Sequence, residues 1–303
     1  MANSVSYAVA YRSMIDRIYK ADSVTAILEA AESRYKFAPE NAQTIYLRKL
    51  SAQGLGDYSR SGGYVAGNNT IAWEAHTFAM DRGRSYNLDA MDAQEAMTGA
   101  MELMAENMRT NIVPEIDAYR IHKICSLVNS GSPNVSADLT DDTAISAIDT
   151  GVEALNDLEV PKEGRVLFVS NTMHSLMKQS GEHINIRFSQ QNNGVLNRNI
   201  ELFDEMPLMK VPAGRFYTAF DFLDGTSVGE TDGGFSAQSG SKVINFMIVP
   251  ISIVIAVIRH MPQKLIPPAL NTNADAWFFA FRLYHDLFIP ENKRTGIYIH
   301  SKA

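Results

Sequence analysis

Apolar and polar residues alternate in two stretches early in the chain, and this pattern predicts a β-hairpin. The two stretches are Ile45–Leu50 and Thr70–Met80, and the segment 54–69 between them is rich in turn-forming Gly, Ser and Asn. At about 3.3 Å per residue, an arm of about ten residues extends about 30 Å. Such a hairpin does not fit inside a compact body, so we predict that it reaches toward another copy of the chain.

The second arm of this hairpin has two chemically different faces. Alternation places Ile71 and Trp73 on one face, and Glu74 and His76 on the other. On the first arm, Arg48 is the cross-strand partner that we expect for Glu74. An isolated two-stranded hairpin is marginal in water and its open edges invite pairing. A neighbouring subunit that covers the hairpin would stabilise it.

The segment from Met91 to Asn129 has the apolar spacing of one long helix. A continuous stripe is formed by Met97, Met101, Met104, Met108 and Ile112. Pro114 lies within the pattern and predicts a kink or a short break. A helix of about 40 residues would be about 60 Å long, twice the diameter of a small domain. We favour core packing for the methionines, with a subunit interface as the alternative.

Residues 1–41 form a polar segment with a weak helical pattern. Asp22–Ser23 is a candidate cap for a short helix with a thin apolar stripe, made of Val24, Ile27, Leu28 and Ala31. We expect this arm to dock on another part of the same chain or of a second copy.

After Pro133 the pattern changes to alternating helices and strands. We expect a helix that begins after Thr140–Thr143, a helix over 172–180 that Ser170–Asn171 caps, and a final hairpin with its turn at 290–296. The predicted strands are Arg165–Val169, Met206–Val211, two buried strands within 243–258 separated at Pro250, Trp277–Ile289 and Ile297–His300. Together with the first half, this order predicts an α+β chain.

Composition narrows the possible functions. The chain of 303 residues is 46% hydrophobic and 20% charged, typical of a globular protein, and its formal net charge is −7. That charge disfavours a surface that binds nucleic acid phosphates. Cys125 is the single cysteine, so neither an internal disulfide nor a CxxC metal site is possible. The most apolar run, 243–258, carries Asn, Pro and Ser, so we expect no membrane segment.

The motifs that could carry chemistry are weak. Gly54–Ser59 resembles a nucleotide-binding loop but leads into more glycine instead of a helix. His285 and Asp286 are adjacent in a strand and therefore point to opposite faces, which excludes a catalytic dyad. His174 and His183 have no companion ligands at metal-binding spacing. We therefore expect no enzyme, no cofactor and no metal, and a buried, unreactive Cys125.

Five motifs in this order resemble the major capsid (head) proteins of tailed bacteriophages. They are Gly54–Tyr58, Thr77–Tyr86, Pro114–Arg120, Arg282–Phe288 and Gly296–His300. The resemblance implies the Hong Kong 97-type capsid fold, with a long spine helix, an extended β-hairpin arm, a peripheral domain and an axial α/β domain. It implies an N-terminal arm at 1–41, the hairpin at 42–86, the peripheral domain at 87–130 and 262–303, and the axial domain at 131–261.

The same resemblance implies function and partners. The chain would self-assemble through pentamers and hexamers into the icosahedral head shell and enclose double-stranded DNA without sequence-specific binding. Since only residues 1–41 precede the hairpin, we expect a separate scaffolding protein or none at all, together with a portal. Assembly would take place in the bacterial host cytoplasm, and the mature location would be the virion. The hairpin tip carries Arg60 and no lysine, so we expect no covalent cross-link.

Charged and aromatic residues along these motifs are our candidates for inter-subunit contacts. Acidic residues are interspersed with the basic pairs, which favours salt bridges across an interface over phosphate binding. The candidates are Arg48, Asp57, Tyr58, Arg60, Trp73, Glu74, Arg82, Arg84, Glu291, Lys293 and Arg294.

Two alternatives stay open. Within the same fold, the chain could form an encapsulin-like nanocompartment that encloses cargo enzymes instead of DNA. From a different class, an α/β hydrolase-like enzyme centred on residues 140–260 would need a pocket with converging histidines and carboxylates, and the sequence shows no such cluster.

Overall fold

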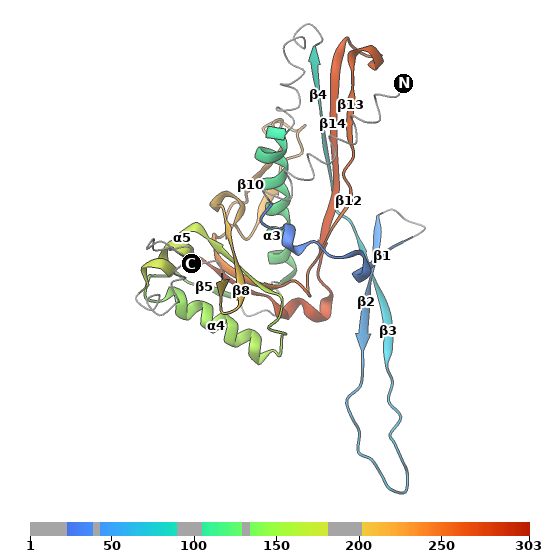
Figure 1. Cartoon of the computed structure of the whole chain (residues 1–303), viewed down its shortest axis with the longest axis vertical. Coiled ribbons are helices and arrows are strands. Elements are labelled where there is room, and N and C mark those ends of the chain that lie inside the picture. The colour runs from blue at the N-terminus through green and yellow to red at the C-terminus, as the bar shows by residue number, and fades with distance from the viewer. Residues whose placement is uncertain (1–22, 39–42, 90–104, 129–133, 181–201) are drawn as a thin grey trace, which may run out of the picture.

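The computed structural model describes residues 23–38, 43–89, 105–128, 134–180 and 202–303. Figure 1 shows a body of helices and sheet, a long narrow sheet that rises from it, and a hairpin that points in the opposite direction. The arrangement is elongated because the hairpin and the long sheet extend in opposite directions.

A mixed six-stranded sheet forms the centre of the body. Its order is β5 (Asn134–Ser136), β15 (Tyr298–Ser301), β11 (Ile244–Pro250), β6 (Arg165–Ser170), β8 (Met206–Val211) and β7 (Leu202–Phe203). The predicted strands at 165–169 and 206–211 and the end of a strand at Pro250 are confirmed. The middle of β6 and most of β11 are apolar because both faces of this sheet are covered.

Helices cover the two faces of the six-stranded sheet. On one face, Leu167 and Ile248 pack with residues of α4 (Ala144–Asp157) and α5 (Asn171–Gln179). On the other face, Phe168 and Val249 pack with Ile121 of α3 (Val113–Val128). Neighbouring residues of a strand point to opposite faces, and this alternation divides the two cores. The predicted cap of α5 is confirmed, since the Ser170 hydroxyl accepts the Met173 N–H.

The helix that contains Pro114 widens instead of breaking. Residues 105–107 are helical, η3 (Met108–Ile112) is a π-helical turn, and α3 follows without interruption. Proline lacks an N–H and its ring crowds the carbonyl four residues earlier, and the wider turn makes room for it. Met108 is buried against Val113 and Leu283, which agrees with core packing at this position. The rest of the predicted methionine stripe, Met97 to Met104, lies outside the described residues.

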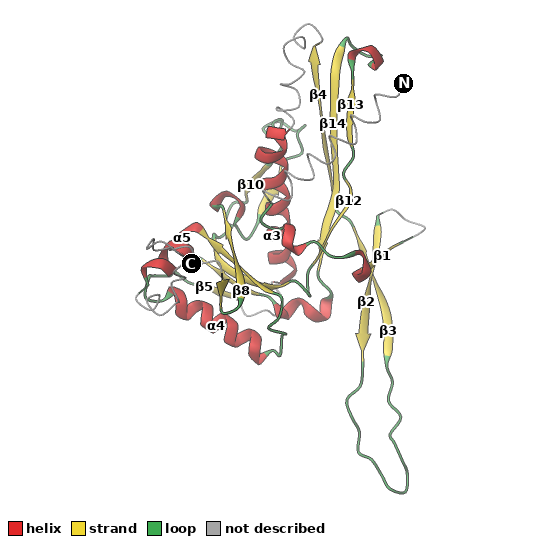
Figure 2. Ribbon diagram, in the orientation of Figure 1, coloured by secondary structure: helices red, strands yellow, loops and turns green. Residues whose placement is uncertain are grey.

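The long sheet has β14 (Ala276–Phe288) at its centre. β4 (Met80–Asp89) pairs along one edge of β14, and β12 (Ile255–His260) and β13 (Gln263–Ile266) pair along the other edge. Figure 2 shows these strands rising together from the body. Glycine is required at Gly83, because a Cβ there would lie 2.8 Å from the Phe281 carbonyl oxygen of β14.

The hairpin consists of β2 (Thr44–Ser51) and β3 (Thr70–Thr77), with β1 (Tyr35–Phe37) added to the outer edge of β2. The predicted pairing is confirmed, although the second arm ends at Thr77 and Met80 already belongs to β4. Short elements complete the chain: β9 (Phe220–Phe222), β10 (Phe235–Ala237), and the 3₁₀ turns η1 (Ala26–Leu28), η2 (Glu32–Arg34), η5 (Ala213–Arg215), η6 (Pro268–Leu270) and η7 (Glu291–Gly296).

Two expectations about secondary structure differ from the structure. The predicted C-terminal hairpin is wrong: β14 and β15 lie in different sheets, because η7 redirects the chain so that β15 inserts between β5 and β11. β15 thus lies in one sheet with β5 and β11, which belong to the segment 131–261 that the resemblance assigned to the axial domain. β12 comes from the same segment but pairs with β14 in the long sheet. The short helix capped by Ser23 is also wrong, because the Ser23 hydroxyl binds Asp117 instead and leaves a three-residue 3₁₀ turn.

Candidate assembly surfaces

The base of the hairpin is fixed firmly to the body. Ile45 and Leu47 of β2 are fully buried in a cluster with Phe78 and Phe288. The guanidinium of Arg34 donates to the carbonyl oxygens of residues 251 and 252, at 3.0 and 2.6 Å. These contacts join the first described segment and the hairpin to strand β12 and the turn before it, so the direction in which the hairpin leaves the body is set by packing.

Beyond its base the hairpin exposes large apolar side chains to solvent. Leu50, Leu55, Tyr58, Tyr64, Val65, Ile71 and Trp73 are all exposed. At the tip the rings of Tyr58 and Tyr64 lie 5.0 Å apart, and two backbone hydrogen bonds join Ser59 and Gly63. Asp57 and Arg60, two of our predicted contacts, are exposed on the same loop. Such a concentration of exposed apolar residues is typical of a surface that a partner covers.

The register of the hairpin separates two residues that we expected to pair. Arg48 lies opposite Trp73, and Leu47 lies opposite Glu74. Since neighbouring strand residues point to opposite faces, Arg48 and Glu74 lie on different sides of the ribbon, and the predicted cross-strand pair is wrong. Glu74 instead contacts the His76 imidazole at 3.0 Å.

Trp73 is partly covered from its own side of the hairpin. The ammonium group of Lys36 lies 5.0 Å from the centre of its ring, as in a cation–π contact. Even so, 47% of the Trp73 surface is exposed. The Lys36 contact therefore leaves about half of the Trp73 surface open to a partner.

Arg82 and Arg84 of β4 bind within the chain. Arg82 pairs with Glu115 at 2.5 Å and donates to the Gly234 carbonyl oxygen at 3.1 Å. Arg84 donates to the carbonyl oxygens of Thr231 and Asp232. Burial raises the pKa of Glu115, and Arg82 opposes this shift. The two arginines thus hold the loop between β9 and β10 against the long sheet, beside a cleft of about 680 Å³.

The turn η7 carries the last three predicted contacts. Glu291 approaches Lys49 of β2 at 3.7 Å, a partly exposed ion pair between this turn and the hairpin base. Lys293 is exposed, and Arg294 is half-buried. Thus an ion pair links η7 to the hairpin base, whereas Asp57, Tyr58 and Arg60 belong to the loop between β2 and β3.

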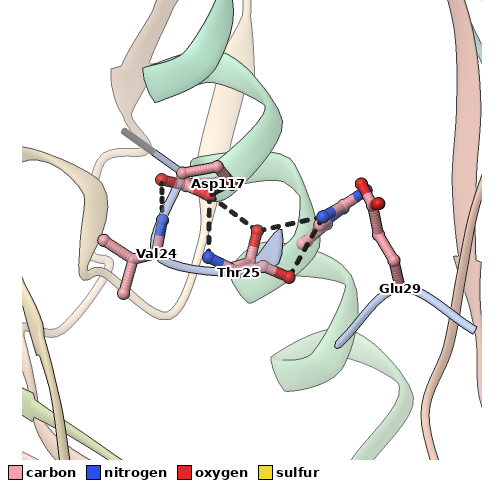
Figure 3. Close-up of polar contacts among 6 residues, drawn as sticks. Val24, Thr25, Glu29 and Asp117 are labelled. Carbon is pink, nitrogen blue, oxygen red and sulfur yellow. Dashed lines mark hydrogen bonds and ion pairs between the residues drawn. The ribbon is translucent and has the colours of Figure 1, made fainter. Parts of the chain in front are cut away.

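A buried charge cluster on α3 anchors the first described segment of the chain. Asp117 is fully buried and accepts hydrogen bonds from the Ser23 hydroxyl, from the backbone N–H groups of Val24 and Thr25, and from the Thr25 hydroxyl, at 2.6 to 3.1 Å. Figure 3 shows the carboxylate over this turn of backbone. Arg215, 3.0 Å from Asp117, supplies a cation from the other side.

Arg120, one helical turn after Asp117, binds the same segment. It is also fully buried and donates to the Thr25 carbonyl oxygen and to Glu29, both at 3.1 Å. Sequence reasoning noticed the Pro114–Arg120 motif but missed its role. The available signal was the spacing: Asp117 and Arg120 are three residues apart, on one face of a helix otherwise rich in apolar residues.

Asp286 is a second buried centre that the sequence did not reveal. It accepts hydrogen bonds from the Tyr119 hydroxyl and the Ala79 N–H, both at 2.8 Å, and lies 3.6 Å from the Lys123 ammonium group. Burial and the Asp286 charge raise the pKa of Tyr119. His285 and Asp286, adjacent in β14, are both buried, and each contacts Tyr119 of α3.

The described side chains offer little reactive chemistry. Burial raises the pKa of the Cys125 thiol to about 12, which confirms the predicted buried cysteine. Gly54–Ser59 lies in the hairpin tip, where no helix follows. Within the described ranges, no group of three or more His, Cys, Asp or Glu side chains is placed to hold a metal ion. In the same ranges, no helix combines the length and the apolar content needed to cross a bilayer.

Comparison with solved structures identifies the fold. The chain is similar to the mature capsid of bacteriophage PhiM1, with a TM-score of 0.61 and 10% identity over 86% of this chain and 82% of that chain. It is similar to the capsid of cyanophage P-SCSP1u, with a TM-score of 0.60 and 8% identity over 90% of each chain. It is also similar to a virus-like particle from Pyrococcus furiosus, with a TM-score of 0.54 and 11% identity over 97% of this chain and 99% of that chain.

Similarity is confined to structure. No protein-family model matches the chain, and no curated protein matches its sequence. The chain nevertheless has the fold of tailed-phage capsid proteins, the Hong Kong 97 type that the resemblance implied.

Proposed function

We propose that this chain is the major capsid protein of a tailed bacteriophage. It self-assembles into an icosahedral head shell and encloses the double-stranded DNA genome. The fold that it shares with phage capsids supports this proposal. The observation that carries it is the projecting hairpin, which displays apolar side chains that the described chain leaves uncovered.

In this proposal each part of the chain has a mechanical role. The hairpin of β2 and β3, within the segment 42–86, is the extended arm that lies on a neighbouring subunit, and the helix that includes α3 is the spine of the peripheral domain. Residues 131–261 correspond mainly to the axial domain, whose copies meet in pentamers and hexamers. The candidate inter-subunit contacts belong to the hairpin, to β4 and to η7. A copy that contacts a different surface on the next copy makes a head-to-tail interface, which can close into rings.

The acidic net charge agrees with DNA that is enclosed but not tightly bound. A chain with a net charge of −7 repels phosphates at long range, so packaged DNA would stay mobile inside the shell. A separate scaffolding protein and a portal would be the other partners. The shell would assemble in the bacterial host cytoplasm and become part of the virion.

Overexpression of the full chain, alone and with the neighbouring phage genes, tests this function. Electron microscopy and light scattering should show closed shells of uniform size. In infected cells, particles that contain this chain should hold nuclease-protected double-stranded DNA. Only monomers or irregular aggregates under every condition would contradict the proposal.

A nanocompartment shell is the second candidate function. The similarity to the virus-like particle from Pyrococcus furiosus, which covers nearly all of both chains, favours keeping it. Particles purified from the native source distinguish the two functions. Protein cargo without DNA would indicate a nanocompartment, and DNA with a portal at one vertex would indicate a phage head.

A further inference from the structure

The outer edge of β3 is an open β-sheet edge without the usual protection. β3 is the last strand of the β1–β2–β3 sheet, so one side of its eight residues has no strand partner within the described chain. Its register with β2 runs from Thr44–Thr77 to Ser51–Thr70 without a bulge. β3 contains no proline or lysine, and its one carboxylate, Glu74, faces His76. Natural proteins normally blunt such edges with charges, prolines or bulges.

Several other edges in the described part of the chain are protected. The free edge of β4 carries Asp81, Arg82, Arg84 and Asp89, which interrupt it with charge. β13 has four residues and includes Lys264, while β5 and β7 have only three and two residues. Short or charged edges seldom add a further strand. β3 therefore lacks these protections, and it lies on the hairpin that projects from the body (Figure 1).

Hydrogen bonds at the hairpin base reveal which backbone groups point outward. The Phe78 N–H donates to the Gln43 carbonyl oxygen at 2.9 Å, so residue 78 faces the β2 side. In an antiparallel ladder, successive residues point alternately toward and away from the partner strand. The even-numbered residues of β3 therefore bond to β2. Ile71, Trp73, Ala75 and Thr77 direct their N–H and C=O groups away from the hairpin.

We propose that the outer edge of β3 binds an extended strand from a second copy of this chain and adds it to the sheet. The partner strand would bond to the backbone of Ile71, Trp73, Ala75 and Thr77 and lay apolar side chains beside Ile71 and Trp73. Strand addition of this kind takes its affinity from main-chain bonds and its specificity from alternate side chains. This inference rests on the proposed shell function and specifies how one of its contacts forms.

The charge of the chain favours a second copy as the occupant. Each copy carries a net charge of −7, so two copies repel each other except where their contact is neutral and apolar. The β3 edge is such a place, because its one carboxylate is turned toward His76. A basic partner would instead favour the acidic surfaces of the chain, and DNA phosphates would be repelled by them. The hairpin also stands clear of its own body, where another molecule can reach it (Figure 1).

Residue-resolved hydrogen exchange on unassembled and assembled wild-type protein tests the proposal. In the unassembled chain, Glu74 and His76 amides should be protected, while Trp73 and Ala75 amides exchange freely. On assembly the Trp73 and Ala75 amides should slow by about 100-fold or more, as amides in a ladder do. Closed particles in which both amides still exchange at the unassembled rate would overturn the inference and leave the shell function intact. Absence of particles would instead remove the shell function on which the inference rests.

A pair of variants at Ala75 provides a second, independent test. Ala75→Pro removes an outward N–H that β2 does not use, a position where edge strands tolerate proline. The concentration needed for half-maximal assembly should rise about tenfold or more, because one bond is lost and the ring obstructs the incoming strand. Ala75→Val, which keeps the N–H, should change this concentration less than about threefold.

The folding of the variant and the source of the strand have their own controls. Protected Glu74 and His76 amides in Ala75→Pro would show that its hairpin is intact. If that protection is lost, the variant has unfolded at the hairpin, and the exchange experiment on the wild-type protein decides whether the proposal holds. Unchanged assembly of a folded Ala75→Pro would overturn the proposal. Protection of Trp73 and Ala75 that appears only after a different protein is added would also overturn it.

Discussion

The central sheet of the body and the projecting hairpin are both built from strands rich in apolar residues, but they differ in where burial comes from. All six residues of β6 are buried, whereas none of the eight residues of β3 is buried. Helices of the same chain cover both faces of β6. The described chain supplies no such cover for most of β3. The body therefore carries most of the folding free energy, and the hairpin beyond its base carries surface that gains stability only from association.

The hairpin base marks the boundary between these two regions. Up to Leu47 the hairpin packs in the cluster with Phe78 and Phe288, and from Leu50 onward its large side chains are exposed. Substitutions on the two sides of this boundary should therefore have opposite consequences. Those in the body should lower the free energy of unfolding, and those beyond the base should weaken assembly at constant stability.

The largest effect on stability is expected from a truncation in the central sheet. Phe168→Ala removes a ring that is 1% exposed between β6 and α3, and it should lower the free energy of unfolding by about 3–5 kcal/mol. Tyr64→Ala at the hairpin tip is the matched control and should change it by less than about 0.5 kcal/mol. Urea unfolding of the unassembled chains measures both. Equal losses for the two variants would contradict the division into two regions.

A loss of about 3 kcal/mol is expected when the buried anchor on α3 is removed. Asp117→Ala leaves Arg215 without its counterion and the N–H groups of Val24 and Thr25 without an acceptor. The segment that begins at Ser23 should detach, and limited trypsin digestion should then cleave at Arg34 faster than in wild type. Ser23→Ala, which removes one of these hydrogen bonds, should cost about 1 kcal/mol. An unchanged cleavage rate in Asp117→Ala would show that the segment is held by other contacts.

Acid should destabilise the body by an intermediate amount. Burial, with smaller contributions from Arg120 and Arg82, lowers the pKa of His285 to about 3. The unfolded chain binds this proton near the ordinary pKa and the folded chain does not, so stability falls as the pH drops from about 6.5 toward 3. The loss should be about 2 kcal/mol at pH 5. Comparison of unfolding profiles for wild type and His285→Gln isolates this residue, and parallel profiles would contradict the assignment.

The smallest effect is expected at the ion pair between η7 and the hairpin base. Glu291→Gln removes the charge that lies 3.7 Å from Lys49, in a partly exposed position. Such pairs contribute between about 0 and 1 kcal/mol, so the melting temperature should barely change. Differential scanning calorimetry at low and high salt measures it. A loss above about 2 kcal/mol would mean that the hairpin base depends on this pair more than on its apolar cluster.

The pattern of the chain predicted the elements of the fold well where burial is regular. The hairpin, the strands at 165–169 and 206–211 and the Ser170 cap follow from alternation and capping, which depend on neighbours in sequence. The pairing of β15 was missed because it depends on long-range contacts with β11 and β5, which no local pattern records. In the same way, alternation predicts which face each hairpin residue lies on, but not the register that separates Arg48 from Glu74.

The buried polar centres were the part of the site that the sequence could not reveal. From composition and hydrophobic periodicity, Asp117, Arg120 and Asp286 are expected at the surface. Only the fold brings Thr25 to Asp117 and Tyr119 to Asp286. By contrast, the exposed aromatic residues of the hairpin could be selected from sequence. A turn-rich loop between alternating strands predicts exposure, and Tyr58 and Trp73 are both exposed. Their role as contacts between subunits remains a prediction.

The most direct test of the account measures stability and assembly together in one hairpin variant. Trp73→Ala removes the largest exposed side chain of β3 without touching the buried cluster at the base. Calorimetry of the unassembled variant should give the wild-type melting temperature, while light scattering should show assembly only at a concentration at least about tenfold higher, as for an interface anchor. Wild-type assembly, or a clearly lower melting temperature, would contradict the claim that this hairpin exists for contact between copies.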